Sequence, residues 1–161
     1  MNNPFADLGH PPGADDPKAQ LNWLADAVRA LDASRDPKIR PLKKRFSRVL
    51  FQFQRSVERA EDQQTAQQRI QPEIDALLLQ VLRALGRTIE QIAQTLRVKQ
   101  TRGQVGPEAT ALIVELQAGA RQFLAMATAV RDGDREAMSA AQLGLNESSQ
   151  RLAEPIQRIA S

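Results

Sequence analysis

The chain has 161 residues, of which 42% are hydrophobic and 25% are charged, as in an ordinary globular protein long enough for one domain. It contains no Cys, which excludes disulfides and cysteine-ligated metals. No stretch approaches the ~18 apolar residues of a membrane-spanning helix, and the N-terminal residues lack the pattern of a secretory signal. We therefore expect a cytoplasmic protein with no transmembrane segment.

The net charge of +3 is unevenly distributed along the chain. Residues 1–36 carry 3 basic and 6 acidic side chains, residues 37–106 carry 14 and 6, and residues 107–161 carry 5 and 7. A basic middle between acidic ends is typical either of a protein with an anionic partner or of a chain whose parts neutralise one another.

Residues 1–16 are rich in proline and glycine, which predicts a flexible tail ahead of a single helical domain over residues 17–161. The tail contains Asn-Pro-Phe at residues 3–5, which resembles a short peptide ligand, and His10, the only histidine, for which the sequence offers no fixed partner. A helix over residues 17–34 follows, because apolar side chains recur at spacings of three and four. They are Leu21, Leu24, Val28 and Leu31.

The clearest helix signal begins at Pro41, a residue suited to the first turn of a helix. Its apolar positions lie within a sector roughly 80° wide at 100° per residue. They are Leu42, Phe46, Val49, Phe53, Val57 and Ala60. Residues 61–71 are polar and are predicted to extend this helix. Pro72 is predicted to break or kink it, because a residue that precedes proline avoids the helical region.

The next helix is predicted over residues 72–101. Its apolar positions cover more than half of the circumference, which is typical of a central helix with neighbours on two sides. Gly103, Gly106 and Pro107 then predict a stop, a turn and a restart.

Two further helices complete the expected fold, one over residues 107–131 and one from Arg135 onward that is kinked at Pro155. Short links between long helices favour antiparallel neighbours. The sequence therefore predicts an all-α fold, an antiparallel bundle of four to five long amphipathic helices with a flexible N-terminal tail.

Cationic side chains cover the face of the helix from Pro41 that lies opposite its phenylalanine stripe. If this helix and the next form a hairpin that turns at Pro72, the end of the second returns beside the start of the first and creates a basic pole. The candidate anion- or partner-binding residues are Lys38, Arg40, Lys43, Lys44, Arg45, Arg48, Arg55, Arg97, Lys99 and Arg102. A site for nucleic-acid phosphates, an acidic membrane surface or an acidic protein would account for them, and so would a solvated helix face.

Phe51 lies on the polar side of the same helix, one turn from both Arg48 and Arg55. Packing beneath the preceding helix, burial between copies of the chain, and contact with a partner would each explain its position. Because aromatic residues beside arginine are favoured at protein interfaces, Phe51 is the candidate interface residue.

The chain offers little for catalysis, since no histidine lies in a predicted helix and Gly103 and Gly106 lack the Lys-Ser/Thr of a phosphate-binding loop. We expect no enzyme activity, no catalytic residues, no cofactor and no metal. The leading hypothesis is a non-catalytic protein–protein interaction or adaptor module that also self-associates. The alternative is a nucleic-acid-associated protein that binds phosphates through the basic pole, and a peripheral membrane binder comes third.

Overall fold

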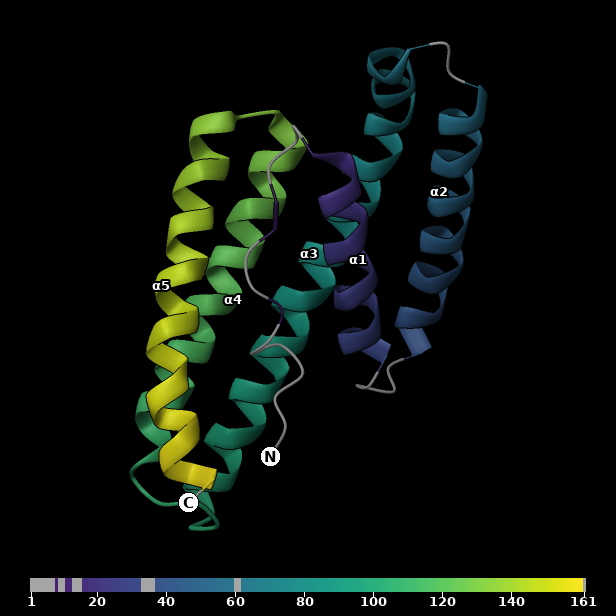
Figure 1. Cartoon of the computed structure of the whole chain (residues 1–161). Coiled ribbons are helices and arrows are strands. Elements are labelled where there is room, and N and C mark those ends of the chain that lie inside the picture. Colours follow the sequence, from purple (N-terminus) through teal and green to yellow (C-terminus); the bar gives the residue numbers. More distant parts are fainter. Residues whose placement is uncertain (1–7, 9–10, 13–15, 33–36, 60–61, 161) are drawn as a thin grey trace.

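The computed structural model describes residues 8, 11–12, 16–32, 37–59 and 62–160, with the backbone alone for residues 63, 149 and 152–160. This part of the chain forms five α-helices and one short 3-10 helix, η1 (Figure 1). Their bounds are α1 Pro17–Asp32, η1 Pro37–Ile39, α2 Arg40–Arg59, α3 Gln63–Thr101, α4 Ala109–Asp132 and α5 Arg135–Ala160. The predicted all-α bundle of four to five helices is confirmed.

The long helix α3 is shared by the two sides of the bundle (Figure 1). α1 and α2 pack against its first part, α4 runs antiparallel along its second part, and α5 packs on α4. Its core side chains are fully buried, as expected for a central helix; they include Ile74, Leu77, Val81, Leu82 and Leu85. None of the described helices has the length and the hydropathy needed to cross a bilayer.

The hairpin between α2 and α3 turns near Asp62, and the break predicted at Pro72 is wrong. α2 ends at Arg59, and the carboxylate of Asp62 caps α3 by accepting a hydrogen bond of 3.0 Å from the backbone N–H of Gln64. The polar residues up to position 71 therefore belong to α3, which continues through Pro72.

The burial of apolar side chains on both sides of Pro72 explains why the helix does not stop there. A proline inside a helix costs roughly 3 kcal/mol, because it removes a backbone hydrogen bond and clashes with the preceding turn. Ala66 and Ile70 precede it and are buried, and Ile74 follows it in the same core. Fully burying one Ile side chain contributes about 1.5–3 kcal/mol, which offsets the cost of the proline.

Two described residues of the predicted tail pack on the bundle, which the sequence did not indicate. Leu8 and Pro11 are buried, and the carbonyl oxygen of Pro11 accepts a hydrogen bond of 2.7 Å from Nε2 of Gln142 in α5. The Asn-Pro-Phe segment at residues 3–5, His10, and the predicted helix end at residues 33–34 lie outside the described residues.

Glycines follow the ends of α3 and α4, and the sequence analysis predicted the first of these stops at Gly103. Gly103 follows α3 with φ of 72°, and Gly133 follows α4 with φ of 65°. This left-handed conformation costs glycine little and lets the chain leave the helix. α5 then remains helical through Pro155, where a kink was predicted.

Candidate functional site

α2 is attached to the bundle by a narrow stripe of side chains. Of its twenty residues, only Leu42 and Val49 are buried. Phe46, Leu50 and Phe53 are half-buried and pack against the core. The opposite face of this helix is therefore exposed over its whole length.

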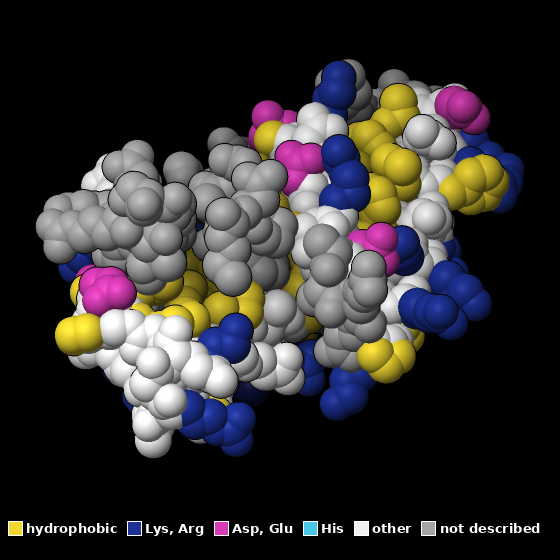
Figure 2. Space-filling model, turned by 90° about the horizontal axis from the view of Figure 1, so that it is seen from below, with side chains coloured by type: hydrophobic (Ala, Val, Ile, Leu, Met, Phe, Trp, Pro, Cys, Tyr) yellow, Lys and Arg dark blue, Asp and Glu magenta, His cyan; other side chains and the backbone are white. Residues whose placement is uncertain are grey.

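Four residues on that exposed face form a stripe that we call the α2 outer stripe: Lys44, Arg48, Phe51 and Arg55. Their spacings of four, three and four place them within about 60° of one another around the helix. Figure 2 shows Lys and Arg side chains along the α2 side of the molecule, beside exposed apolar side chains.

Phe51 is the aromatic centre of this stripe. Its side chain is 57% exposed, so packing beneath the preceding helix, one of the three explanations left open by the sequence, does not account for its position. The guanidinium carbon of Arg55 lies 5.6 Å from the centroid of the Phe51 ring, which is within the range of a cation–π interaction. The ring is therefore held at the surface next to a positive charge.

The other predicted cations at the start of α2 differ in their surroundings. Nζ of Lys43 lies 2.7 Å from Oδ2 of Asp32, an ion pair that joins α2 to the end of α1. Arg40 is exposed, whereas Arg45 is half-buried. Lys43 thus has a structural partner within the chain.

The predicted basic pole does not form, because Arg97, Lys99 and Arg102 lie too far along α3. The start of α2 faces the segment 80–91 of α3. Lys99 is eleven residues beyond Thr88, which corresponds to about 16 Å along the helix axis. The three exposed cations therefore lie at the opposite end of α3 from the α2 hairpin.

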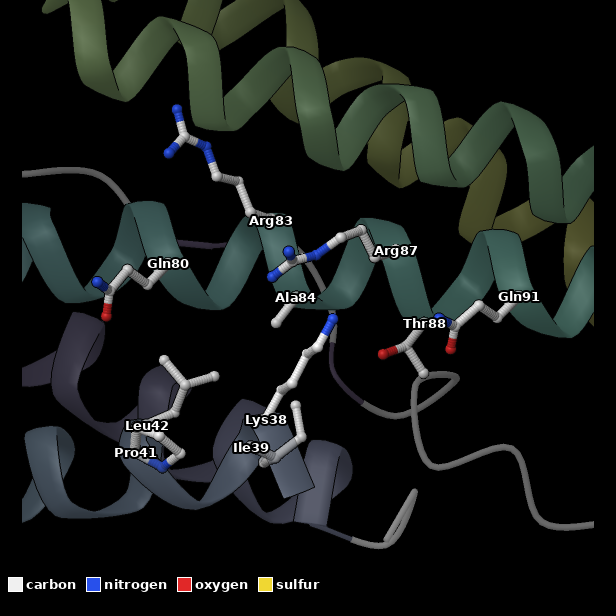
Figure 3. Close-up of a pocket in the computed structure, with 10 residues that line it drawn as sticks. All are labelled: Lys38, Ile39, Pro41, Leu42, Gln80, Arg83, Ala84, Arg87, Thr88 and Gln91. Carbon is white, nitrogen blue, oxygen red and sulfur yellow. The ribbon is translucent and has the colours of Figure 1, made fainter. Parts of the chain in front are cut away.

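The structure instead brings Lys38 together with Arg83 and Arg87, two residues that the sequence reasoning missed. All three line a cavity of about 340 Å³ between the start of α2 and the middle of α3 (Figure 3). The sequence held a signal for this arrangement, namely Asp62, a good helix-capping residue ten positions before Pro72. A hairpin that turns at Asp62 places Arg40 near Ala84.

A larger cavity of about 670 Å³ lies between the start of α1, α3 and the turn from α4 to α5. Nε2 of Gln71 donates hydrogen bonds to Oε1 of Gln20 at 3.1 Å and to Oδ1 of Asp75 at 2.9 Å. Met126 and Met138 contribute apolar surface to the same cavity. Its polar groups therefore link α1 to α3.

In the part of the chain that the structure describes, no group of three or more His, Asp or Glu side chains could hold a metal ion. No protein-family model, curated protein or solved structure matches the chain. Function must therefore be inferred from the surface and the cavities of this fold.

Proposed function

We propose that the chain is a non-catalytic protein–protein interaction module that binds a partner through the α2 outer stripe. The observation that carries this proposal is Phe51, an aromatic side chain that is 57% exposed and has the guanidinium of Arg55 over its ring. Burying a Phe side chain contributes about 1.5–3 kcal/mol, so a partner that covers the ring gains affinity. Arginine is also among the residues that contribute most to binding at protein interfaces.

The charge of α2 indicates what kind of partner fits. The helix carries seven Lys or Arg side chains and one carboxylate, Glu58. Spacings of four, three and four are those by which one helix packs along another. We infer an acidic amphipathic helix of another protein, with an apolar side chain against Phe51 and carboxylates against the flanking cations.

Self-association belongs to the same proposal, but charge restricts how it can occur. Two outer stripes facing each other would bring the cations Lys44, Arg48 and Arg55 of both copies together, and like charges repel. A second copy must therefore offer a different and more acidic surface. Residues 107–161, with seven acidic and five basic side chains, have the required sign of charge.

Affinity capture from the native cell with matched variants tests the proposal. Phe51→Glu replaces the apolar ring of the proposed contact with a carboxylate. Val114→Glu makes the same kind of change on α4, at an apolar side chain that is 56% exposed. A captured protein is then purified, and its binding to each variant is measured by calorimetry.

We expect binding to the parent chain and to the Val114→Glu variant with equal affinity, and binding at least about tenfold weaker to the Phe51→Glu variant. Nuclease treatment of the extract removes proteins that are captured through nucleic acid. If no captured protein distinguishes Phe51→Glu from Val114→Glu, the outer stripe is not the interaction surface.

A nucleic-acid-associated protein is the second candidate, because most cations of α2 are exposed. Arg97, Lys99 and Arg102 were expected to add to the same basic surface, but they lie far from the start of α2. Mobility shifts with generic DNA and RNA at low and moderate salt distinguish the two candidates. A complex that weakens steeply with salt would favour this second candidate, and no complex even at low salt would exclude it.

A further inference from the structure

The cavity between η1, the start of α2 and the middle of α3 has a charged rim and an apolar floor (Figure 3). The floor is made by buried side chains, namely Ile39, Leu42 and Ala84. The rim carries polar side chains, namely Lys38, Gln80, Arg83, Arg87, Thr88 and Gln91. Its volume of about 340 Å³ lies within the range of small-molecule sites.

Among the described residues that line this cavity, the charged side chains all have the same sign. Arg83 and Arg87 are one helical turn apart on α3, a spacing at which like charges repel. Within the described residues neither of them forms an ion pair. Glu90, one turn beyond Arg87, is exposed and is not part of the lining. The described lining residues thus include three cations and no carboxylate.

The three cationic side chains differ in orientation. In Figure 3, Lys38 extends from η1 across the cavity toward the guanidinium of Arg87. The guanidinium of Arg83 points away from α2 and from the other two cations. An anion between Lys38 and Arg87 would interact favourably with both groups.

Thr88 adds a hydroxyl group to the lining of the cavity. Thr95, Thr101 and Thr128 each donate the side-chain hydroxyl to the carbonyl oxygen four residues earlier, at 2.9, 3.0 and 3.1 Å. Thr88 is buried, lines the cavity and makes no such bond within the described residues. In Figure 3 its hydroxyl points into the space between α3 and η1. A donor is therefore available beside the cations.

We propose that this cavity is a binding site for a phosphate monoester. A phosphate dianion offers three terminal oxygens for Lys38, Arg87 and the hydroxyl of Thr88, and arginine recognises such oxygens through paired N–H donors. The apolar floor accommodates the organic part of the ester, since the cavity extends over Ile39 and Leu42. The site is separate from the α2 outer stripe and does not depend on the proposed partner.

Calorimetric titration of the full chain at low salt tests the site with two probes, inorganic phosphate and phenyl phosphate. Phenyl phosphate is expected to saturate one site and to bind more tightly than inorganic phosphate, because its ring covers the apolar floor. Phenol, which lacks the phosphate, is expected not to bind.

Three variants localise the binding. Arg87→Gln removes a cation of the rim and is expected to weaken the binding of phenyl phosphate at least about tenfold. Thr88→Val keeps the shape and the charge but removes the hydroxyl, and is expected to weaken the binding of phenyl phosphate about threefold. Arg97→Gln makes the same charge change outside the cavity, and its effect should stay below about twofold. Circular dichroism confirms that each variant is folded.

Two results would overturn the site. One is the absence of saturable phenyl phosphate binding to the parent chain, and the other is an equal loss in the Arg87→Gln and Arg97→Gln variants, which would mean that only overall charge matters. Competition with oligonucleotides identifies the source of the phosphate. If a 5′-phosphorylated oligonucleotide displaces phenyl phosphate and its 5′-hydroxyl counterpart does not, the site takes the end of a nucleic acid. If neither displaces it, the site takes a small phosphate ester.

Discussion

Two buried helical glycines, Gly86 in α3 and Gly119 in α4, are expected to respond in opposite ways to the same substitution by alanine. A Cβ added at Gly86 would lie 3.0 Å from Cγ of Leu124 and 3.3 Å from the carbonyl oxygen of Ala120, both in α4. At Gly119 the nearest atom would be Cβ of Ser148 at 4.0 Å, an ordinary van der Waals distance. The first glycine permits close approach of α3 and α4, whereas the second has room for a methyl group.

Whether each substitution stabilises or destabilises the fold depends on two competing effects. Replacing glycine with alanine inside a helix stabilises it by about 1 kcal/mol. Overpacking a well-packed core costs about 1–3 kcal/mol. Leu124 is 36% exposed and can turn outward, but the backbone carbonyl of Ala120 cannot move independently of α4. Gly119→Ala should therefore stabilise the fold by about 1 kcal/mol, and Gly86→Ala should destabilise it by roughly 0–2 kcal/mol.

Urea unfolding followed by circular dichroism at one temperature measures both effects, and thermal unfolding provides a second readout. Gly119→Ala is expected to raise the thermal midpoint by about 2–4 °C, and Gly86→Ala to leave it unchanged or lower it. The dependence of the unfolding free energy on urea should be the same in both variants, since neither exposes new surface. If both substitutions stabilise the protein equally, α3 and α4 do not approach each other closely at Gly86, and the packing described above is refuted.

Three further predictions concern the turn, the outer stripe and the tie between α1 and α2. Asp62→Ala removes the cap on the N–H of Gln64 and should lower the free energy of unfolding by about 1 kcal/mol in urea; no change would mean that α3 begins elsewhere. Phe51→Glu should change that free energy by less than about 0.5 kcal/mol, because the ring is exposed, while lowering the mass measured by light scattering. A parent chain that is strictly monomeric would contradict self-association. A double-mutant cycle on Lys43 and Asp32 should give a coupling of about 0.2–1 kcal/mol that falls with salt, since both side chains are about half exposed; a larger coupling that does not respond to salt would contradict this account.

Much of the fold follows from local periodicity, because each helix must bury one face. The stripe from Leu21 to Leu31 is buried as predicted, and so are Leu42 and Val49 on α2. The end of α3 was predictable because glycine is required by the backbone at Gly103. In these places the local sequence and the tertiary structure favour the same conformation.

The prediction failed where local preference and core packing disagree. Pro72 is locally a helix breaker, and a rule that considers neighbouring residues alone ends the helix there. The buried side chain of Ile70 precedes that proline and stabilises the helix only through contacts made in the folded core. Such contacts join residues that are distant in the sequence, so a local rule does not contain them.

The position of this one turn decides which cations lie close together. In an antiparallel hairpin, moving the turn by a given number of residues moves the partner of each residue in the first helix by twice that number. A turn at Pro72 places the start of α2 beside Arg102, whereas the observed turn near Asp62 places it beside Arg83 and Arg87. The charge of each residue was visible in the sequence, but which residues lie side by side depends on the register of the hairpin. An error in the position of the turn therefore produced an error twice as large, in residues, in the predicted neighbours of α2. The α2 outer stripe involves a single helix and no register, which is why Phe51 could be identified from the sequence whereas the cavity beside Lys38 could not.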